Sequence, residues 1–419
     1  MKLVHAADLH LDSPLLGLER YDGAPVHRLR NATREAFENL VKLCIDESAA
    51  LLLLAGDLYD GNWRDYSTGL FFAAGMSKLR RAGVRVVWIR GNHDAASQIA
   101  KNLELPPNVR ELDHKRPDTV TYEEIGVVVH GQGFATREVR ENLARTYPNP
   151  RPGLFNIGML HTSVTGRPGH DPYAPCTTDD LRERGYEYWA LGHVHQREEL
   201  SCDPWMVFPG NLQGRHAREC GGKGATVVTV EDLRVRAVEH RVLDSVRWAV
   251  CEIDVSDCAS PHEVLAALER SLAVEHAKAD TRLLAARVVV SGQSGAHAAL
   301  AREPARWLAE ARLLATDLGG DDIWLEKMQL HTRDTVPLTE LRARDDAVGQ
   351  VFRGLAELRG SDAELSSLSQ EFGELANKLP LSMREGPDSL RLDDPETLRR
   401  ALDEVEQLLL PRLVGGGDE

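Results

Sequence analysis

The sequence lacks several features that mark membrane and secreted proteins. No stretch approaches the roughly 18 to 20 uninterrupted apolar residues of a membrane helix. The N-terminal stretch MKLVHAADLHLD carries Asp and His within its first ten residues, which does not fit a secretory signal. The six cysteines form no C-x-x-C pair, so we expect free thiols and neither a disulfide framework nor a zinc site. We therefore expect a cytoplasmic protein with no membrane partner.

The chain also lacks an excess of basic residues. It has 50 Lys and Arg against 65 Asp and Glu, which gives a net charge of −15. This charge, taken alone, argues against a protein that coats nucleic acid. The acidic excess is uneven, because residues 361–419 contain 14 acidic and 6 basic residues. A local site upstream could still attract phosphate, particularly if it holds bound cations.

A chain of 419 residues is too long for one ordinary core, so we expect two or three domains. Over residues 1–245, short apolar runs alternate with helical patterns, and this order is typical of an α/β layered fold. The predicted strands are 2–7, 51–55, 84–89, 127–130, 157–160, 188–191, 207–209 and 225–230. A helix is predicted over 65–83. Residues 246–335 are predicted to form a second, small α/β domain.

Residues 336–419 are predicted to be a helical and acidic C-terminal segment. Its amphipathic patterns VGQVFRGLAELRG and PETLRRALDEVEQLLLPRL flank a predicted loop. One interpretation is solvated helices that pack on the body of the protein. The other is a docking arm for another protein, because apolar stripes occur on a short segment.

Side chains of the types that bind metals follow five predicted strands. In open α/β sheets, ligands bind at the carboxyl ends of the strands, so these residues are expected to meet at one rim. Each fragment alone is weak, because D-x-H and G-D also occur in ordinary turns, and the argument depends on all five occurring in order. The residues are Asp8, His10, Asp57, Asn92, His161, His193 and His195.

This set contains two carboxylates, one amide and four imidazoles. It suffices for two divalent ions if one carboxylate bridges them. With no thiolate in the set, Mn²⁺ or Fe²⁺ is favoured, although Zn²⁺ remains possible. Paired ions about 3.5–4 Å apart clamp the attacking and leaving oxygens of a displacement at phosphorus. The pattern therefore predicts a two-metal hydrolase of phosphate esters.

His93 lies next to Asn92 and is expected to point away from the ions, toward the leaving oxygen. An imidazole there can act as a general acid, and the alternative is that it orients another group. Asp60 and Asp94 are predicted either to orient ligand histidines or to form plain turns and helix caps.

Contacts to the substrate backbone are predicted for three arginines and one loop. Arg64, Arg90 and Arg215 lie near the metal motifs and could bind phosphates, although a surface salt bridge is the commoner explanation for any one arginine. The loop PGNLQGRH, residues 209–216, follows a strand, and its glycines permit close approach of a ligand to the backbone. His5, His130, His216 and the histidines after residue 240 are expected to be structural.

The series D-x-H, G-D-x-x-D, G-N-H-D, a lone His after a strand and G-H-x-H resembles the calcineurin-like metallophosphoesterase pattern. The segments HAADLHLDSPL, LLLAGDLYD and WIRGNHDAAS resemble the nuclease subunit of the bacterial SbcCD complex. The segments GDLYDGNWRDYSTGLFF and FPGNLQGRHARECGGKG resemble the YhaO-type branch of DNA repair exonucleases. This resemblance covers roughly residues 1–245.

The resemblance implies a role for each candidate residue. It assigns His93 to the scissile phosphate and Asp57 to a bridge between the ions. Some nucleases of this group carry a second His where this chain has Asp60, so the role of that position stays open. The resemblance assigns the remaining ligands to one ion (Asp8, His10 and His195) or to the other (Asn92, His161 and His193).

The resemblance also implies a fold and an activity. The expected fold is α/β: a four-layer α/β/β/α metallophosphoesterase sandwich with a small α/β capping domain and a helical C-terminal segment. The expected activity is 3′-to-5′ exonuclease and single-strand endonuclease action on DNA, with two divalent ions, Mn²⁺ favoured. Family members form homodimers and work with a coiled-coil, SMC-like ATPase that docks on the C-terminal part.

Two other functions remain open from the sequence. A small-molecule phosphodiesterase or phosphomonoesterase would share the fold and the metals, because specificity resides in loops. A non-catalytic scaffold for the ATPase is a third possibility, but it conflicts with the complete ligand set and His93.

Overall fold

The computed structural model describes residues 1–13, 23–60, 66–96, 105–164, 173–335, 337–379, 391–392 and 394–414. The chain forms two compact units. The first contains Met1–Ala249 and Ala279–Ala285, and the second contains Val250–Lys278 and Ala286–Glu419. The predicted boundaries at residues 245 and 335 stay predictions. In the described ranges, no helix has both the length and the apolar character to cross a membrane.

Two six-stranded sheets form the centre of the first unit. The first sheet has the spatial order β12 (Arg234–Val242), β11 (Gly224–Glu231), β1 (Lys2–Ala6), β2 (Leu51–Leu54), β3 (Arg85–Trp88) and β4 (Val109–Glu111). The second has the order β5 (Asp118–Tyr122), β6 (Val127–Gly131), β7 (Phe155–His161), β8 (Tyr188–Gly192), β10 (Trp205–Phe208) and β9 (Glu198–Cys202). The strands β1 to β4 run parallel, as do β6, β7, β8 and β10.

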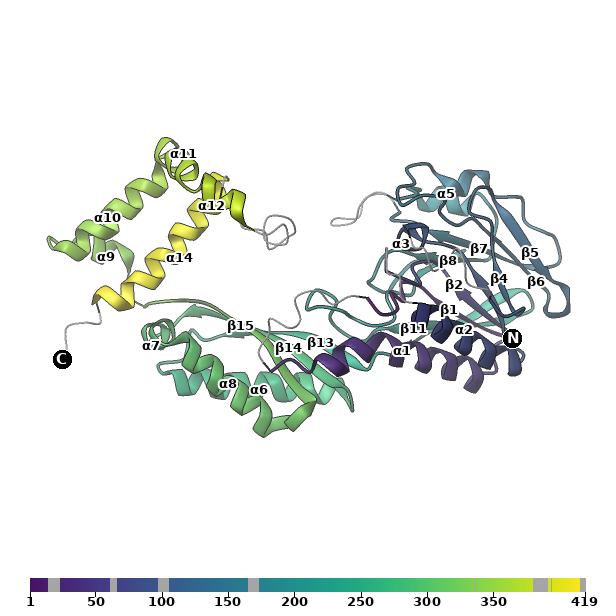
Figure 1. Ribbon diagram of the computed structural model, residues 1–419, viewed down its shortest axis with the longest axis horizontal. Helices are drawn as coiled ribbons and strands as arrows, with labels where there is room; N and C mark the ends of the chain where they lie inside the picture. The colour runs from purple at the N-terminus through teal and green to yellow at the C-terminus, as the bar shows by residue number, and fades with distance from the viewer. Residues whose placement is uncertain are drawn as a thin grey trace. The chain divides into compact units, whose positions relative to one another are not determined.

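Helices cover the outer face of each sheet. Figure 1 shows α1 (Val26–Asp46) and α2 (Tyr66–Arg81) on one side of the unit and α5 (Thr178–Arg182) on the other. The short elements of this unit are α3 (Asn92–Ala96), η2 (Glu123–Ile125) and η3 (Leu143–Thr146). The layers are therefore helix, sheet, sheet and helix, which confirms the predicted four-layer α/β/β/α sandwich.

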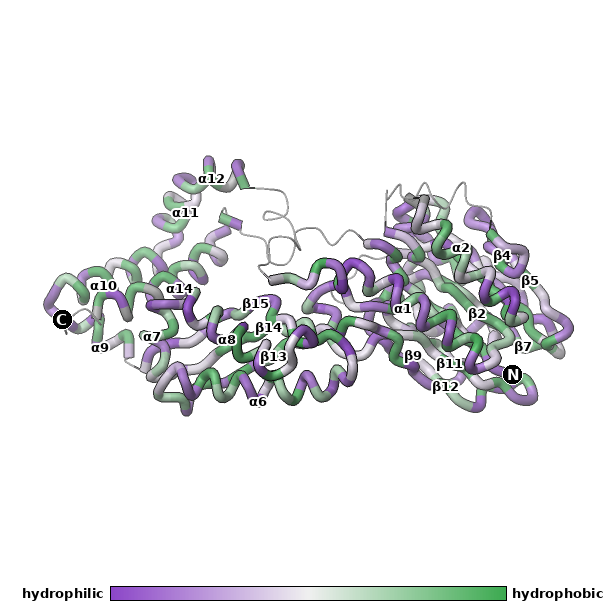
Figure 2. The backbone as a smooth tube through the Cα atoms, turned by 60° about the horizontal axis from the view of Figure 1, so that its bottom comes forward, coloured by the Kyte–Doolittle hydropathy of each residue, from purple (hydrophilic) through white to green (hydrophobic). Residues whose placement is uncertain are grey.

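The run Leu51–Leu54 shows why the strands are apolar on both faces. Leu52 and Leu54 pack in the core beneath α1 and α2, whereas Leu51 and Leu53 pack in the core between the sheets. All four side chains are buried. A strand buried on both faces has no polar alternation, and Figure 2 shows β2 in the hydrophobic colour.

The second unit has a three-stranded sheet in the order β13 (Val246–Asp254), β14 (Leu283–Gln293) and β15 (Ile323–Arg333). Its helices in this part are α6 (Pro261–Ala279), α7 (His297–Arg302) and α8 (Pro304–Gly319), with the turn η4 (Gly320–Asp322). Beyond the sheet lie α9 (Leu338–Arg342), α10 (Ala347–Gly360), α11 (Asp362–Glu371), α12 (Gly373–Lys378) and α14 (Pro395–Val414). The predicted helical C-terminal segment is confirmed.

Candidate metal centre

All seven predicted ligands follow strands of the two central sheets, near the carboxyl ends of these strands. In chain order they are Asp8 and His10 after β1, Asp57 after β2, Asn92 after β3, His161 at the end of β7, and His193 and His195 after β8. The loops are joined by backbone hydrogen bonds of 3.0 Å from Asp8 N to Gly56 O and from His10 N to Asp57 O. Parallel neighbouring strands thus bring these side chains to one rim.

The first group of ligand atoms comes from Asp8, His10 and His195, which lie within 4.8 Å of one another. The Nε2 atoms of His10 and His195 face each other at 3.3 Å. His195 Nε2 lies 3.9 Å from an Asp8 oxygen, and His10 Nε2 lies 4.0 Å from Asp57 Oδ2. Two imidazole nitrogens directed at each other beside two carboxylates form a site that one cation can share.

The second group contains Asp57, His161 and Asn92. His161 Nε2 lies 3.5 Å from Asp57 Oδ2 and 2.9 Å from Asn92 Oδ1. Its Nδ1–H donates to the Ala55 carbonyl at 2.9 Å, so Nε2 is the nitrogen that faces the carboxylate and the amide oxygen. The His193 ring lies edge-on to His161, with ring centroids 5.3 Å apart. Asp57 contacts both groups, as a bridging ligand must.

The loops that carry the ligands have unusual backbone conformations. Positive φ angles occur at Asp8 (52°), His10 (44°), Asp57 (53°) and His193 (96°). Non-glycine residues rarely adopt this region, and such strain is concentrated at functional sites. Gly91 allows close approach as well, because a Cβ atom there would lie 2.2 Å from Asp57 Oδ1.

The charges of the site fit two divalent cations. Burial raises the pKa of Asp8. Although burial lowers the pKa of His161, the Asp57 charge and hydrogen bond raise it to about 9. The buried carboxylates therefore need positive charge close by, which a protonated His161 supplies when no ion is bound. Asp57 would bridge two ions held by the remaining oxygen and imidazole nitrogen donors, a set suited to Mn²⁺, Fe²⁺ or Zn²⁺.

His93 lies beside the first group, and one of its ring nitrogens lies within 4.8 Å of ligand atoms of His10 and Asp60. Its Nδ1 is 2.7 Å from Asp60 Oδ1, and its ring lies edge-on to His10 at a centroid distance of 4.9 Å. Burial lowers the pKa of His93, but the Asp60 hydrogen bond and the Asp57 charge outweigh it, so the pKa is raised overall. The Asp60 contact therefore favours the protonated form of the His93 imidazole.

The two acidic residues considered from the sequence have different partners. Asp60 bonds to His93, and its other oxygen accepts from Ser13 Oγ at 2.5 Å. Asp94 accepts backbone N–H bonds of 3.0 Å from Leu58, Tyr59 and Gly91. Asp94 thus holds the loops after β2 and β3 together.

Glu219, a buried carboxylate that contacts His195, was not predicted from the sequence. His195 Nδ1–H donates to Glu219 Oε1 at 2.6 Å. Lys223, also missed, donates from Nζ to the His195 carbonyl oxygen at 2.9 Å. Both lie in loop sequence with no ligand-like spacing, so only their contacts reveal them.

The three arginines differ in their surroundings. Arg215 lies beside the candidate metal centre, with Nη1 3.5 Å from Asp60 Oδ2. Arg90 forms an ion pair of 2.5 Å with Glu111. Arg64 lies outside the described residues.

Two of the histidines expected to be structural bond to the protein core. His5 is fully buried, and its nitrogens lie 3.0 Å from Tyr188 Oη and 3.1 Å from the Leu191 carbonyl oxygen. His130 lies 2.9 Å from Thr119 Oγ1, and its ring stacks on Tyr186. His216 is half exposed and lies 3.8 Å from Glu219.

Comparison with known families identifies the two parts of the chain. Residues 1–197 match the calcineurin-like phosphoesterase family, and residues 248–333 match the middle domain of the metallophosphoesterase YhaO. The chain carries a calcineurin-like metallophosphoesterase domain and a YhaO-type middle domain. This confirms the predicted resemblance. A solved dimetal phosphatase from Danio rerio aligns with 55% of this chain and 93% of its own, at 11% identity and a TM-score of 0.33.

Among similar proteins is the uncharacterized metallophosphoesterase YhaO of Bacillus subtilis, 35% identical over 261 residues. Another is the DNA double-strand break repair protein Mre11 of Methanopyrus kandleri, 28% identical over 230 residues. The alignments cover 61% and 50% of this chain, and 64% and 48% of these relatives. The family match supports a metal-dependent hydrolase of the metallophosphoesterase superfamily.

Proposed function

We propose that this protein is a two-metal, Mn²⁺-dependent DNA nuclease that hydrolyses phosphodiester bonds in DNA repair as a 3′-to-5′ exonuclease and single-strand endonuclease. The observation that carries the chemistry is the His93–Asp60 pair beside two groups of ligand atoms, both of which Asp57 contacts. The similarity to Mre11, a protein named for DNA double-strand break repair, supports DNA as the substrate.

Two divalent ions, when bound, would supply positive charge to the phosphate and activate water for attack. Asp8, Asp57, Asn92 and the ligand histidines would hold these ions. Because His93 Nδ1 bonds to Asp60, the proton on Nε2 is the one that His93 gives to the leaving oxygen as the ester P–O bond breaks. Asp60 fixes the orientation of the His93 ring and favours the protonated form of this imidazole.

Of the two candidate arginines that the structure describes, Arg215 is the better placed to bind the scissile phosphate. Its side chain is 15% exposed and lies beside Asp60, the partner of His93. A planar guanidinium can bind phosphate through two parallel hydrogen bonds. Arg64 and Arg90 remain proposed contacts to more distant phosphates of the DNA backbone.

The proposal extends to partners and location. We assign the protein to the cytoplasm, as a homodimer that works with a coiled-coil, SMC-like ATPase docked on the helical C-terminal segment. The amphipathic helices α10 and α14 support this assignment, because exposed Val351 and Val405 lie on them.

The test compares two substrates with the metal-stripped full chain to which Mn²⁺ is returned. The proposal predicts Mn²⁺-dependent hydrolysis of both single-stranded DNA and a nitrophenyl phosphodiester. Hydrolysis of the nitrophenyl ester without cleavage of DNA would support the alternative of a small-molecule phosphodiesterase. No hydrolysis of either substrate would favour the scaffold.

A further inference from the structure

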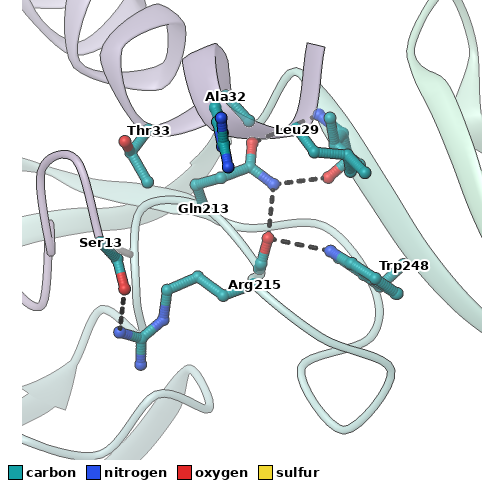
Figure 3. Close-up of a pocket in the computed structure, with 10 residues that line it drawn as sticks. Ser13, Leu29, Ala32, Thr33, Gln213, Arg215 and Trp248 are labelled. Atoms are coloured by element: carbon teal, nitrogen blue, oxygen red, sulfur yellow. Dashed lines mark hydrogen bonds between the residues drawn. The ribbon is translucent and has the colours of Figure 1, made fainter. Parts of the chain in front are cut away.

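Residues 209–223, here called the strap, connect β10 to β11 beside the metal centre. The Gln213 amide donates to the Val246 carbonyl at 2.7 Å, and its oxygen accepts from Ser245 N at 2.9 Å. Trp248 Nε1–H donates to the Gly214 carbonyl at 3.0 Å. Figure 3 shows the bonds of Gln213 to Val246 and of Trp248 to Gly214, with Arg215 reaching toward Ser13. These hydrogen bonds therefore hold the strap against residues 245–248.

The strap contacts two metal ligands through its backbone. Asn211 N–H donates to the His195 carbonyl at 3.2 Å, and Leu212 N–H approaches the Asp8 carbonyl at 3.4 Å. Lys223, at the far end of the strap, donates to the same His195 carbonyl and is buried. The backbone of His195 is thus held from both ends of the strap.

Glu219 holds the ring of His195. Its side chain is 6% exposed, and Oε1 accepts the His195 Nδ1–H bond of 2.6 Å. Its other oxygen accepts from Arg215 N at 2.8 Å and from Asn211 Nδ2 at 3.0 Å. The Arg215 guanidinium lies 3.4 Å from Oε1. A buried carboxylate with this many donors has one fixed orientation.

We propose that Glu219 is a positioning residue that couples the first ion site to the binding of the scissile phosphate. It keeps the proton of His195 on Nδ1, so that the Nε2 lone pair faces Asp8 and His10. The same carboxylate holds the backbone of Arg215 and approaches its guanidinium. This inference rests on the proposed function, because it assumes that Arg215 binds substrate phosphate.

The position of the proton on His195 decides whether its ring can bind a cation. A neutral imidazole binds a cation only through the nitrogen that carries no proton. A carboxylate that accepts the other N–H fixes the ring orientation and makes the ligand more basic, and removing such a partner costs 10- to 100-fold in metal affinity as an order of magnitude. Without Glu219, His195 could place its proton on Nε2 and face the ion with an N–H group.

Arg215 connects the ion site to the proposed proton donor through its guanidinium. Its guanidinium lies between Glu219, behind a metal ligand, and Asp60, behind the proton donor His93. Both contacts are long, at 3.4 and 3.5 Å. A phosphate that approaches the ions can therefore bind Arg215 without breaking a short ion pair.

The first experiment measures Mn²⁺ binding alone. The metal-stripped full chain is titrated with Mn²⁺ by calorimetry, and electron paramagnetic resonance reports the coupled ion pair. Wild type is expected to bind two ions. In Glu219→Gln, one ion should bind roughly 10- to 100-fold more weakly, and the coupled signal should be lost at two equivalents of Mn²⁺. Glu199→Gln is the matched control, because Glu199 pairs with Arg197 near the surface, and it should behave as wild type.

The second readout separates positioning from a general folding defect. Cleavage by Glu219→Gln should recover as Mn²⁺ is raised, whereas Arg215→Ala should keep a raised KM at every Mn²⁺ concentration. Two ions bound by Glu219→Gln with wild-type affinity would overturn the role of Glu219 and leave the nuclease proposal intact. Two ions bound by wild type without cleavage of DNA would overturn the nuclease proposal and leave the role of Glu219 in ion binding intact.

Discussion

At the scale of single residues, the account depends most on the Asp60–His93 pair. The Asp60 carboxylate raises the pKa of His93 against the effect of burial, and so keeps the imidazole protonated to higher pH. Asp60→Asn should therefore slow cleavage and move the alkaline limb of the pH–rate profile to lower pH. The rate should fall about 10- to 100-fold, a part of what general acid catalysis contributes. Single-turnover rates measured across pH test this.

The control for this prediction is Asp179→Asn, because Asp179 is an exposed acid on α5 that pairs with Arg182. Its profile should match that of wild type. If the alkaline limb of the pH–rate profile of Asp60→Asn lay at the same pH as in wild type, Asp60 would not act through His93.

His5 gives a prediction about stability that is independent of the metals. Burial lowers its pKa from 6.5 to about 3, with a smaller opposing effect of its bond to the Leu191 carbonyl. Below pH 6.5, the unfolded chain takes up a proton on His5 that the folded chain does not. The free energy of unfolding should therefore fall by about 1.4 kcal/mol per pH unit as the pH drops toward 3.

His5→Gln tests this with a group that donates and accepts but does not titrate. Urea unfolding at a series of pH values should give a shallower dependence in the variant than in wild type. Parallel curves would show that His5 is not neutral in the folded state.

The sequence allowed us to predict the candidate ligands at the ends of strands. It did not allow us to predict the residues that contact these ligands from elsewhere in the chain. Asp8, Asp57 and His161 each follow an apolar run directly, so their position at the rim follows from strand order. Glu219 reaches His195 from a loop 24 residues further on. No periodicity encodes such a contact, because it depends on how the strap folds back.

At the scale of elements, the packing of α1 on α2 depends on a glycine. A Cβ atom at Gly75 in α2 would lie 2.5 Å from Phe37 Cε1 in α1. Gly75→Ala should therefore lower the stability of the first unit by about 1–3 kcal/mol, although alanine favours helix. Gly354→Ala in α10 meets nothing within 4 Å and should stabilise its own unit by up to about 1 kcal/mol.

Thermal unfolding of both variants checks this pair of predictions. The two substitutions are chemically identical and differ only in the space around the added methyl group. A midpoint raised by Gly75→Ala would contradict the close contact between α1 and α2.

The position of a strand in its sheet explains which strands could not be predicted from the sequence. The predicted strands are buried on both faces and appear as apolar runs, as Val127–Gly131 does. The strands β4, β5, β9 and β12 were not predicted, and each lies at or beside the edge of its sheet. Most of their residues are only partly buried, so they carry no apolar run and little alternation.

At the scale of the whole molecule, the proposed metal centre would link activity to stability. Buried Asp8 and Asp57 gather negative charge where the two sheets meet at one rim, and cations bound there favour the folded chain. An ion present at 100 times its Kd adds about 2.7 kcal/mol to the free energy of unfolding. Mn²⁺ should raise the unfolding midpoint, and a chelator should reverse this.

Asp57→Asn removes the shared ligand, so its midpoint should respond far less to Mn²⁺. Differential scanning fluorimetry with and without chelator is sufficient. An equal response in the variant would mean that Mn²⁺ stabilises the chain from another site.

The central claim is that the rim of the first unit cleaves DNA with His93 as the proton donor. The most direct measurement is cleavage of end-labelled single- and double-stranded DNA in Mn²⁺, with wild type beside His93→Asn. The account predicts Mn²⁺-dependent cleavage by wild type and a rate lower by about 10²- to 10⁴-fold in the variant, with Mn²⁺ binding retained. Equal rates for the two proteins would contradict it.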